Sequence, residues 1–137
     1  NTTTGQWVTA QTDPGTTRPN GQYSFRTTFD LTGFVPSTAT ITVNLAADDS
    51  LILQLNGTTI TSGGGYNART TFTIPVGSNF VTGTNTLDFI VDNYSGPTGL
   101  RTELSGHFTA LPVPEPASLL LLSAGLAGLA LRRRRAG

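Results

Sequence analysis

Apolar and polar side chains alternate with a period of two through residues 20–110, and this pattern restricts the fold more than any other feature of the sequence. In the segment YSFRTTFDL, for example, Tyr23, Phe25 and Phe29 lie on one side of an extended backbone. Such alternation is typical of β-strands that place one face on a core and the other in solvent. No segment before residue 117 has helical periodicity, so the sequence predicts an all-β domain.

Six segments carry the alternating pattern, and turn-forming residues separate them. They are residues 23–31, 39–46, 51–60, 70–76, 86–93 and 100–110. Short strands at this spacing predict an antiparallel β-sandwich. The segment 51–60 is predicted to be a hairpin, because Asn56 and Gly57 tolerate the positive φ angles of a type I′ turn.

Two of these segments allow more detailed expectations. Pro75 predicts an edge position for its strand, in which Val76 continues the inward face. In the last segment, Leu104 is expected to face inward. Arg101 and Glu103 share the outer face of that strand, and we expect them to form a surface ion pair.

The end of the chain differs in composition from the rest. Residues 117–131 contain only Ala, Leu, Gly and Ser, and as a helix they would span roughly 22 Å at 1.5 Å per residue. We expect a short transmembrane helix rather than a buried helix, because the stretch is apolar all round and arginine side chains can snorkel. The stretch is followed by Arg132, Arg133, Arg134 and Arg135. These arginines predict that the tail stays in the cytoplasm.

These features predict four regions. They are a β-sandwich ectodomain at 1–110, a proline-rich hinge at 111–116, a transmembrane helix at 117–131 and a cytoplasmic tail at 132–137. The composition alone leaves open whether the helix is a lasting anchor or a signal that is later removed.

The hinge and the tail together resemble the PEP-CTERM sorting signal. A proline-flanked glutamate, an apolar segment and a terminal arginine cluster follow one another in the order of that signal. The motif residues are Val113, Pro114, Glu115, Pro116, Ala117 and Ser118. The resemblance implies a Gram-negative source, a transient anchor in the inner membrane, processing by the membrane protease exosortase, and delivery to the cell envelope or extracellular matrix. A proline-flanked segment is extended, so a protease can bind it as a strand.

Residues 21–110 resemble the galactose-binding-like jelly rolls found in PEP-CTERM proteins and in accessory modules of glycosidases. The resemblance rests on the stretches YSFRTTFDLTGF, AADDSLILQLNG, NTLDFIVDN and GPTGLRTELSG. The family implies one or two further N-terminal strands, which only GQWVTA around Trp7 represents. Because the chain also starts without Met, we expect a fragment or a processed form.

Aromatic side chains beside planar polar groups can form a platform for a sugar. The aromatic candidates, in or near predicted loops, are Trp7, Tyr66 and Tyr94, with Arg69, Asn93 and Arg101 as hydrogen-bonding partners. The alternative is that Trp7 and Tyr94 only cover the edges of the sandwich. We expect no cofactor, although Asp48 and Asp49 offer oxygen ligands for calcium. The alternative is that they form the turn into the next strand through bonds from side chain to backbone.

Catalysis and nucleic-acid binding find no support in the sequence. The chain lacks Cys, which excludes disulfides and thiolate metal sites, and no catalytic motif surrounds its single histidine, His107. Residues 1–112 carry four arginines against seven acidic residues, a net charge of −3, whereas phosphate contacts need a basic surface. We expect a non-enzymatic protein of the cell surface or exopolysaccharide matrix. The alternatives are a carbohydrate-binding module for a specific glycan or an accessory domain of a glycoside hydrolase.

Overall fold

A computed structural model of the chain describes residues 6–10 and 15–112. The sorting motif Val113–Ser118, the expected transmembrane helix at 117–131 and the arginine cluster at 132–135 lie outside the described residues. Within the described ranges, no helix is long and apolar enough to cross a membrane.

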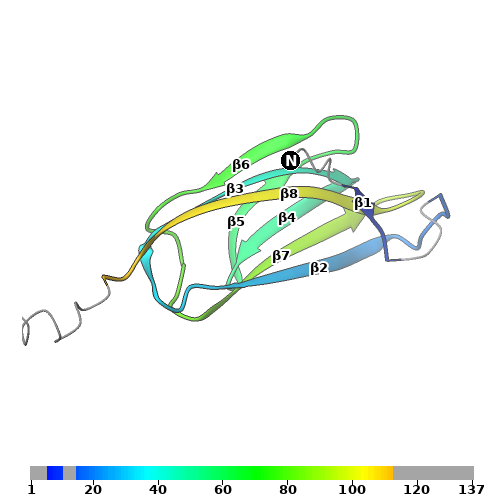
Figure 1. The fold of residues 1–137 in the computed structure, drawn as a ribbon. Helices are drawn as coiled ribbons and strands as arrows, with labels where there is room; N and C mark the ends of the chain where they lie inside the picture. Colours follow the sequence, from blue (N-terminus) through cyan, green and yellow to red (C-terminus); the bar gives the residue numbers. More distant parts are fainter. Residues whose placement is uncertain (1–5, 11–14, 113–137) are drawn as a thin grey trace, which may run out of the picture.

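In this part of the chain, eight strands form two four-stranded antiparallel sheets that pack face to face (Figure 1). One sheet has the order β1-β8-β3-β6, and the other has the order β2-β7-β4-β5. The strands are β1 (Trp7–Val8), β2 (Gly21–Asp30), β3 (Phe34–Asp48), β4 (Ser50–Leu55), β5 (Thr58–Gly63), β6 (Thr70–Ile74), β7 (Thr84–Asn93) and β8 (Gly99–Ala110). The prediction of an all-β antiparallel sandwich is confirmed.

The alternating apolar residues form the core between the two sheets. On β7, Leu87, Phe89 and Val91 are buried, and β3 in the other sheet contributes Val43 and Leu45. Full burial of a side chain of this size contributes roughly 1.5–3 kcal/mol to stability. The core therefore explains why the period-two pattern extends over most of the described chain.

Strand β3 is longer than the sequence predicts. It begins at Phe34 and includes Pro36, a residue that cannot donate a hydrogen bond within a sheet. The register of β3 with β8 shifts between Val35 and Thr40, and β6 pairs only with residues 41–45. Pro36 therefore lies in an irregular stretch, where a missing backbone donor disrupts no regular ladder.

Val76 does not continue the inward face of β6, so this prediction is wrong. The strand ends at Ile74, and Val76 is exposed in the turn that follows. Pro75 has no N–H group and ends the ladder at this point. The strand does lie at the edge of its sheet, as Pro75 predicted.

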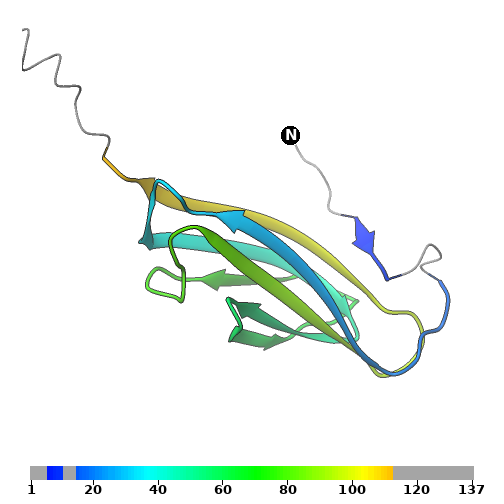
Figure 2. The same cartoon turned by 90° about the horizontal axis from the view of Figure 1, so that it is seen from below.

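β2 and β8 run along one long side of the sandwich (Figure 2) and belong to different sheets. β2 is the edge of its own sheet, and β1 pairs with only two residues of β8. An apolar groove of about 170 Å³ between the two strands is lined in part by Phe29, Leu104 and Phe108. Leu104 faces the core side as predicted but is 44% exposed, because no strand of the described chain covers it.

A buried amide joins the β4–β5 turn to the β6–β7 loop. Asn56 and Gly57 have φ angles of 49° and 79°, which confirms the predicted positive φ at both turn positions. Asn85 is fully buried, and its Oδ1 accepts from Asn56 Nδ2 and from Val81 N, both at 2.9 Å. Its Nδ2 donates to the carbonyls of Val81 and Gly83 at 2.7 and 2.9 Å. The oxygen and the nitrogen of the Asn85 amide therefore each make two hydrogen bonds.

Replacing Asn85 with alanine is expected to lower the free energy of unfolding by roughly 2–3 kcal/mol, because several buried backbone groups lose their partner. Urea unfolding of the full chain in detergent micelles, followed by circular dichroism, measures this loss. Asn79→Ala is the matched control, since the Asn79 amide donates to Thr58 Oγ1 at the surface and should cost less than about 0.5 kcal/mol. Equal losses in the two variants would contradict a special role for Asn85.

Different loops and strand ends lie at the two ends of the sandwich (Figure 1). At one end, here called the loop end, lie the β3–β4 junction, the β5–β6 loop and the β7–β8 loop, because β5 ends opposite the start of β4. At the other end, here called the tail end, β8 finishes at Ala110 beside the start of β3.

Candidate functional site

Asp48 and Asp49 connect β3 to β4 at the loop end and contact the end of β7. Their peptide bond is cis. Tyr94 N donates to Asp49 Oδ2 at 2.6 Å, and Asp49 N donates to the carbonyl of Asp92 at 3.0 Å. The aspartates therefore form the turn into β4. The carboxylate of Asp49 accepts a hydrogen bond from Tyr94, directly after β7, and not from a residue of that turn.

Asn93, the last residue of β7, carries a buried acceptor without a partner. Its side chain is 2% exposed, and Nδ2 donates to the carbonyls of Arg18 and Pro19 at 3.2 and 3.1 Å. Its Oδ1 has no hydrogen-bond partner among the described residues. An unpaired buried acceptor costs roughly 1–3 kcal/mol, so this oxygen is suited to a ligand. We call Asp48, Asp49, Asn93 and Tyr94 the loop-end cluster.

The loop-end cluster holds two carboxylates close together. The pKa of Asp48 is raised above that of an ordinary aspartate, first by partial burial and then by the negative charge of Asp49. Two carboxylates and an unpaired amide oxygen are the hard oxygen ligands that Ca²⁺ prefers. Within the described ranges, no three His, Cys, Asp or Glu side chains group to hold a metal. The fit to calcium therefore depends on the amide oxygen of Asn93.

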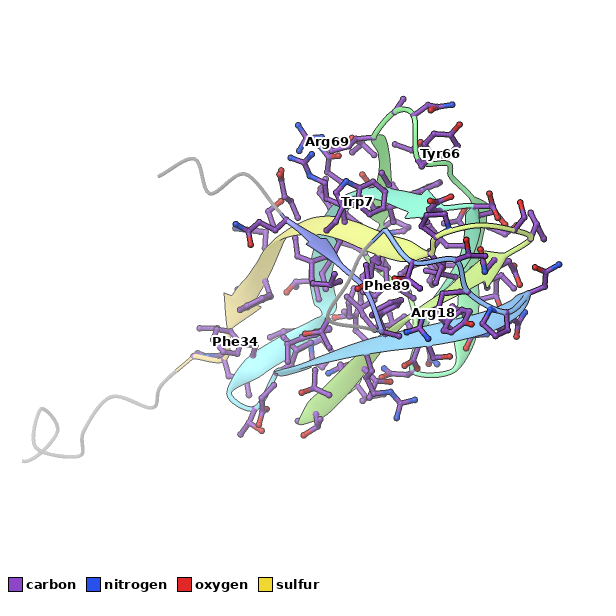
Figure 3. The ribbon with its side chains drawn as sticks, turned by 90° about the vertical axis from the view of Figure 1, so that its right-hand side faces the viewer. Trp7, Arg18, Phe34, Tyr66, Arg69 and Phe89 are labelled. Atoms are coloured by element: carbon purple, nitrogen blue, oxygen red, sulfur yellow. The ribbon has the colours of Figure 1, made fainter. Side chains whose placement is uncertain are left out.

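Tyr94 presents an aromatic ring beside this cluster. It is 63% exposed, and its hydroxyl lies 3.0 Å from Ser50 Oγ at the start of β4. The structure thus brings the predicted candidates Asn93 and Tyr94 next to the two aspartates. Tyr66, another candidate, is exposed in the β5–β6 loop (Figure 3).

The remaining candidates lie on the β1-β8-β3-β6 sheet or at its border. Trp7 pairs with Arg101 across β1 and β8, and Arg69 Nη1 contacts Glu103 Oε1 at 2.6 Å. The predicted pair of Arg101 with Glu103 is therefore wrong, because Glu103 pairs with Arg69. Side chains two residues apart on one strand are separated by nearly 7 Å along the backbone, whereas Arg69 reaches Glu103 from the far side of β3.

Two residues at the loop end were not among the candidates from sequence. Arg18 N donates to the carbonyl of Gly96 at 2.7 Å, and Thr98 Oγ1 donates to the carbonyl of Asp48 at 2.9 Å. Both contacts join loops that are distant in sequence, and the side-chain pattern contains no signal for either. They hold the β1–β2 and β7–β8 loops in place around the loop-end cluster.

Comparison with known families supports the interpretation of the C-terminal segment. Residues 112–135 match the PEP-CTERM protein-sorting motif, which confirms the resemblance found in the sequence. Such a motif implies export and passage through the membrane during sorting. A search of curated proteins returned no match.

Solved structures similar to this chain include a lectin with a β-sandwich fold. The lectin from Pleurotus ostreatus in complex with GalNAc is 30% identical, with a TM-score of 0.62 over 77% of this chain. Its apo form is 25% identical, with a TM-score of 0.56 over 82% of this chain. This chain spans only 29% and 36% of the length of those two chains. The expected lectin-like, galactose-binding-like sandwich is thereby confirmed.

A third similar structure is an enzyme. The α-L-rhamnosidase from Streptomyces avermitilis, solved with L-rhamnose, is 17% identical with a TM-score of 0.50. The match covers 82% of this chain and 12% of the rhamnosidase. At this level of identity, the similarity concerns the fold alone.

Proposed function

We propose that this chain is an exported, non-enzymatic protein of the cell surface or extracellular matrix whose sandwich binds carbohydrate at the loop-end cluster. The observation that carries the proposal is the buried, unpaired Oδ1 of Asn93, which directly precedes Tyr94, the residue whose N–H donates to Asp49 Oδ2. A bound ligand would explain why a polar atom is buried there without a partner. The similarity to a lectin crystallised with GalNAc supports a sugar as the ligand.

We propose Ca²⁺ as the cofactor of this site. Asp48, Asp49 and Asn93 would hold it through side-chain oxygens, and the ion would supply coordination sites for sugar hydroxyls. Because Ca²⁺ takes about 6–8 oxygen ligands, three side chains leave room for backbone carbonyls and for the sugar. The exposed ring of Tyr94 offers a surface on which the apolar face of a sugar can stack.

We also propose that exosortase processes the segment Val113–Ser118. The proposed layout is a sandwich at 1–110, a hinge at 111–116, a transmembrane helix at 117–131 and a cytoplasmic tail at 132–137. The position of Ala110 supports this layout, because β8 finishes at the tail end (Figure 1). The loop-end cluster would then face away from the membrane and toward the glycans outside.

The full chain in detergent micelles is expected to bind glycans in the presence of Ca²⁺ and to lose this binding in EDTA. Asp49→Asn should reduce the affinity roughly 10–100-fold, since it removes a charged ligand from the site. Tyr94→Ala should reduce it roughly 3–10-fold through loss of stacking. A glycan array that includes GalNAc, followed by titration calorimetry with the strongest ligand, measures both effects.

Asp30→Asn is the matched control for Asp49→Asn. The Asp30 carboxylate also accepts a backbone N–H, that of Thr32, but it lies at the tail end. We therefore expect unchanged glycan affinity. Binding that is indifferent to EDTA and to Asp49→Asn would contradict the calcium site, and a lack of binding to every glycan would contradict the carbohydrate proposal as a whole.

A further inference from the structure

The outer face of the β1-β8-β3-β6 sheet is hollowed by a polar groove. Its volume is about 570 Å³, which falls in the range of ligand sites. Its outward side chains come from three adjacent strands, and they are Thr42, Asn44, Thr71, Glu103 and Ser105. We call this hollow the face groove.

Two outward side chains on this face carry a polar atom without a partner among the described residues: Asn44, which lines the face groove, and Arg101, which lies beside the lining. Asn44 Oδ1 is an acceptor and Arg101 Nε is a donor, and both atoms are buried. The register places Asn44 opposite Glu103 and Arg101 opposite Ala46, so the two atoms belong to neighbouring positions on one face. A hydroxyl group can donate to the first and accept from the second. This pair of atoms therefore suits the hydroxyls of a sugar.

Trp7 borders the same part of the sheet. It lies opposite Arg101 on β1 and is 41% exposed. Its ring packs against Gly99, where an added Cβ would come within 3.3 Å of Trp7 Cε3. The missing side chain at Gly99 thus lets the indole lie close to β8. A fixed, exposed indole beside a polar groove is an arrangement on which a sugar ring can stack.

The charges at the face groove favour an uncharged ligand. Glu103 is the acidic residue of the lining, and its carboxylate is neutralised by Arg69 at 2.6 Å. Arg69 directly precedes β6 and Glu103 lies on β8, so the ion pair spans β3 across this face. Figure 3 shows Trp7 and Arg69 on the same side of the molecule, away from Arg18.

We propose that the face groove binds an extended, neutral polysaccharide. Trp7 stacks on one sugar, while Asn44 Oδ1 and Arg101 Nε bond hydroxyls of the next. The outer face of the sheet leads from the face groove to the loop-end cluster, because Asp48 pairs with Gly99, two residues along β8 from Arg101. From Asp48 to Thr42, β3 extends about 20 Å at 3.3–3.4 Å per residue, which is enough for several sugar rings. The inference rests on the proposed carbohydrate binding and extends it from the loop-end cluster to a polymer that runs along the sheet.

The test uses ladders of oligosaccharides from one to six units, prepared from galactan, glucan, mannan and xylan. Titration calorimetry on the full chain in detergent micelles with Ca²⁺ should give an affinity that rises about tenfold or more between one unit and four, because each added contact contributes to binding. Asn44→Ala and Arg101→Lys should each lower the affinity for the longer ligands roughly 3–10-fold, since each deletes one hydrogen-bonding atom. Trp7→Ala should act in the same way through loss of stacking.

Gln54→Ala is the matched control, because Gln54 is an amide on the outer face of the other sheet and already donates to Thr59 Oγ1. It should leave the dependence on ligand length unchanged. Thermal unfolding by circular dichroism checks that each variant is folded. An affinity independent of length on every ladder, or a length dependence that survives both Asn44→Ala and Trp7→Ala, would overturn the proposal.

The same titrations distinguish a failure of the loop-end cluster to bind sugar from a failure of the face groove. Tyr94→Ala should weaken one-unit and six-unit ligands by the same factor if both proposals are right. If the longer ligands depend on Asn44 while Tyr94→Ala and EDTA have no effect on any ligand, the face groove stands and the loop-end cluster does not bind sugar.

Discussion

Phe89→Ala is expected to reduce the free energy of unfolding by about 3–5 kcal/mol. Phe89 is the largest of the fully buried side chains and lies on β7 between Phe25 of β2 and Leu53 of β4. Its removal would leave a cavity in the middle of the core, where strands on both sides fix the backbone and limit collapse. Because domains of this kind are stable by only about 5–15 kcal/mol, the loss should be visible as a large shift of the urea midpoint.

Tyr66→Ala provides the control for the loss of an aromatic ring at the surface. Tyr66 is exposed in the β5–β6 loop, so its substitution should change stability by less than about 0.5 kcal/mol. Urea unfolding of the full chain in detergent micelles compares the two variants. A cost below about 1 kcal/mol for Phe89→Ala would mean that the core is not packed as described.

Glu115→Gln is expected to slow processing of the C-terminal signal about tenfold or more. Glu115 is the charged residue within Val113–Ser118, and a hydrogen bond to a charged group contributes roughly 1.5–3 kcal/mol, or about 10–100-fold in rate if it is made in the transition state. Substitution of Pro114 and Pro116 by alanine should add to the defect, because the segment would be less strongly extended. Pulse-chase labelling in a host that expresses exosortase measures the fraction of chain that leaves the inner membrane.

Leu111→Ala is the control for these variants. Leu111 is exposed and precedes the segment that matches the sorting motif. Its substitution should leave the rate of release unchanged. Release of Glu115→Gln at the wild-type rate, together with normal release of the proline variants, would show that the protease does not recognise this motif.

The sandwich could be predicted from the sequence because its strands have one buried face. Leu87, Phe89 and Val91 occupy alternate positions and are all buried, so their spacing carries the information. Deviations occur where local chemistry interrupts the alternation. Pro75 ends β6 before Val76, and an irregular register with β8 allows β3 to include Pro36.

The sites were harder to predict, because they depend on which strands are neighbours. Asn93 and Tyr94 were identified by residue type, but their position beside Asp49 follows from the pairing of β4 with β7. The unpaired atom of Asn93 likewise depends on loops distant in sequence. The predicted partner of Glu103 is wrong for the same reason, since Arg69 reaches it from the β5–β6 loop.

The C-terminal signal could be identified from sequence because its parts are contiguous. Val113–Ser118, the apolar stretch and the arginine cluster need no tertiary contact to be recognised, and the match at residues 112–135 rests on the same segment. The orientation of the loop end relative to the C-terminal signal could not be predicted in this way. It requires the strand topology, because the loop-end cluster and Ala110 lie at opposite ends of β3 and β8.

The intact mass of the mature protein tests whether this chain is exported and processed at its C-terminal signal. Protein recovered from the surface or medium of wild-type cells should lack the cluster at 132–135, with a new C-terminus at or near Val113–Ser118. Cells without exosortase should retain the full tail in the inner membrane. Mature protein from wild-type cells that still carries all four arginines would contradict the account and would identify the tail as a permanent anchor.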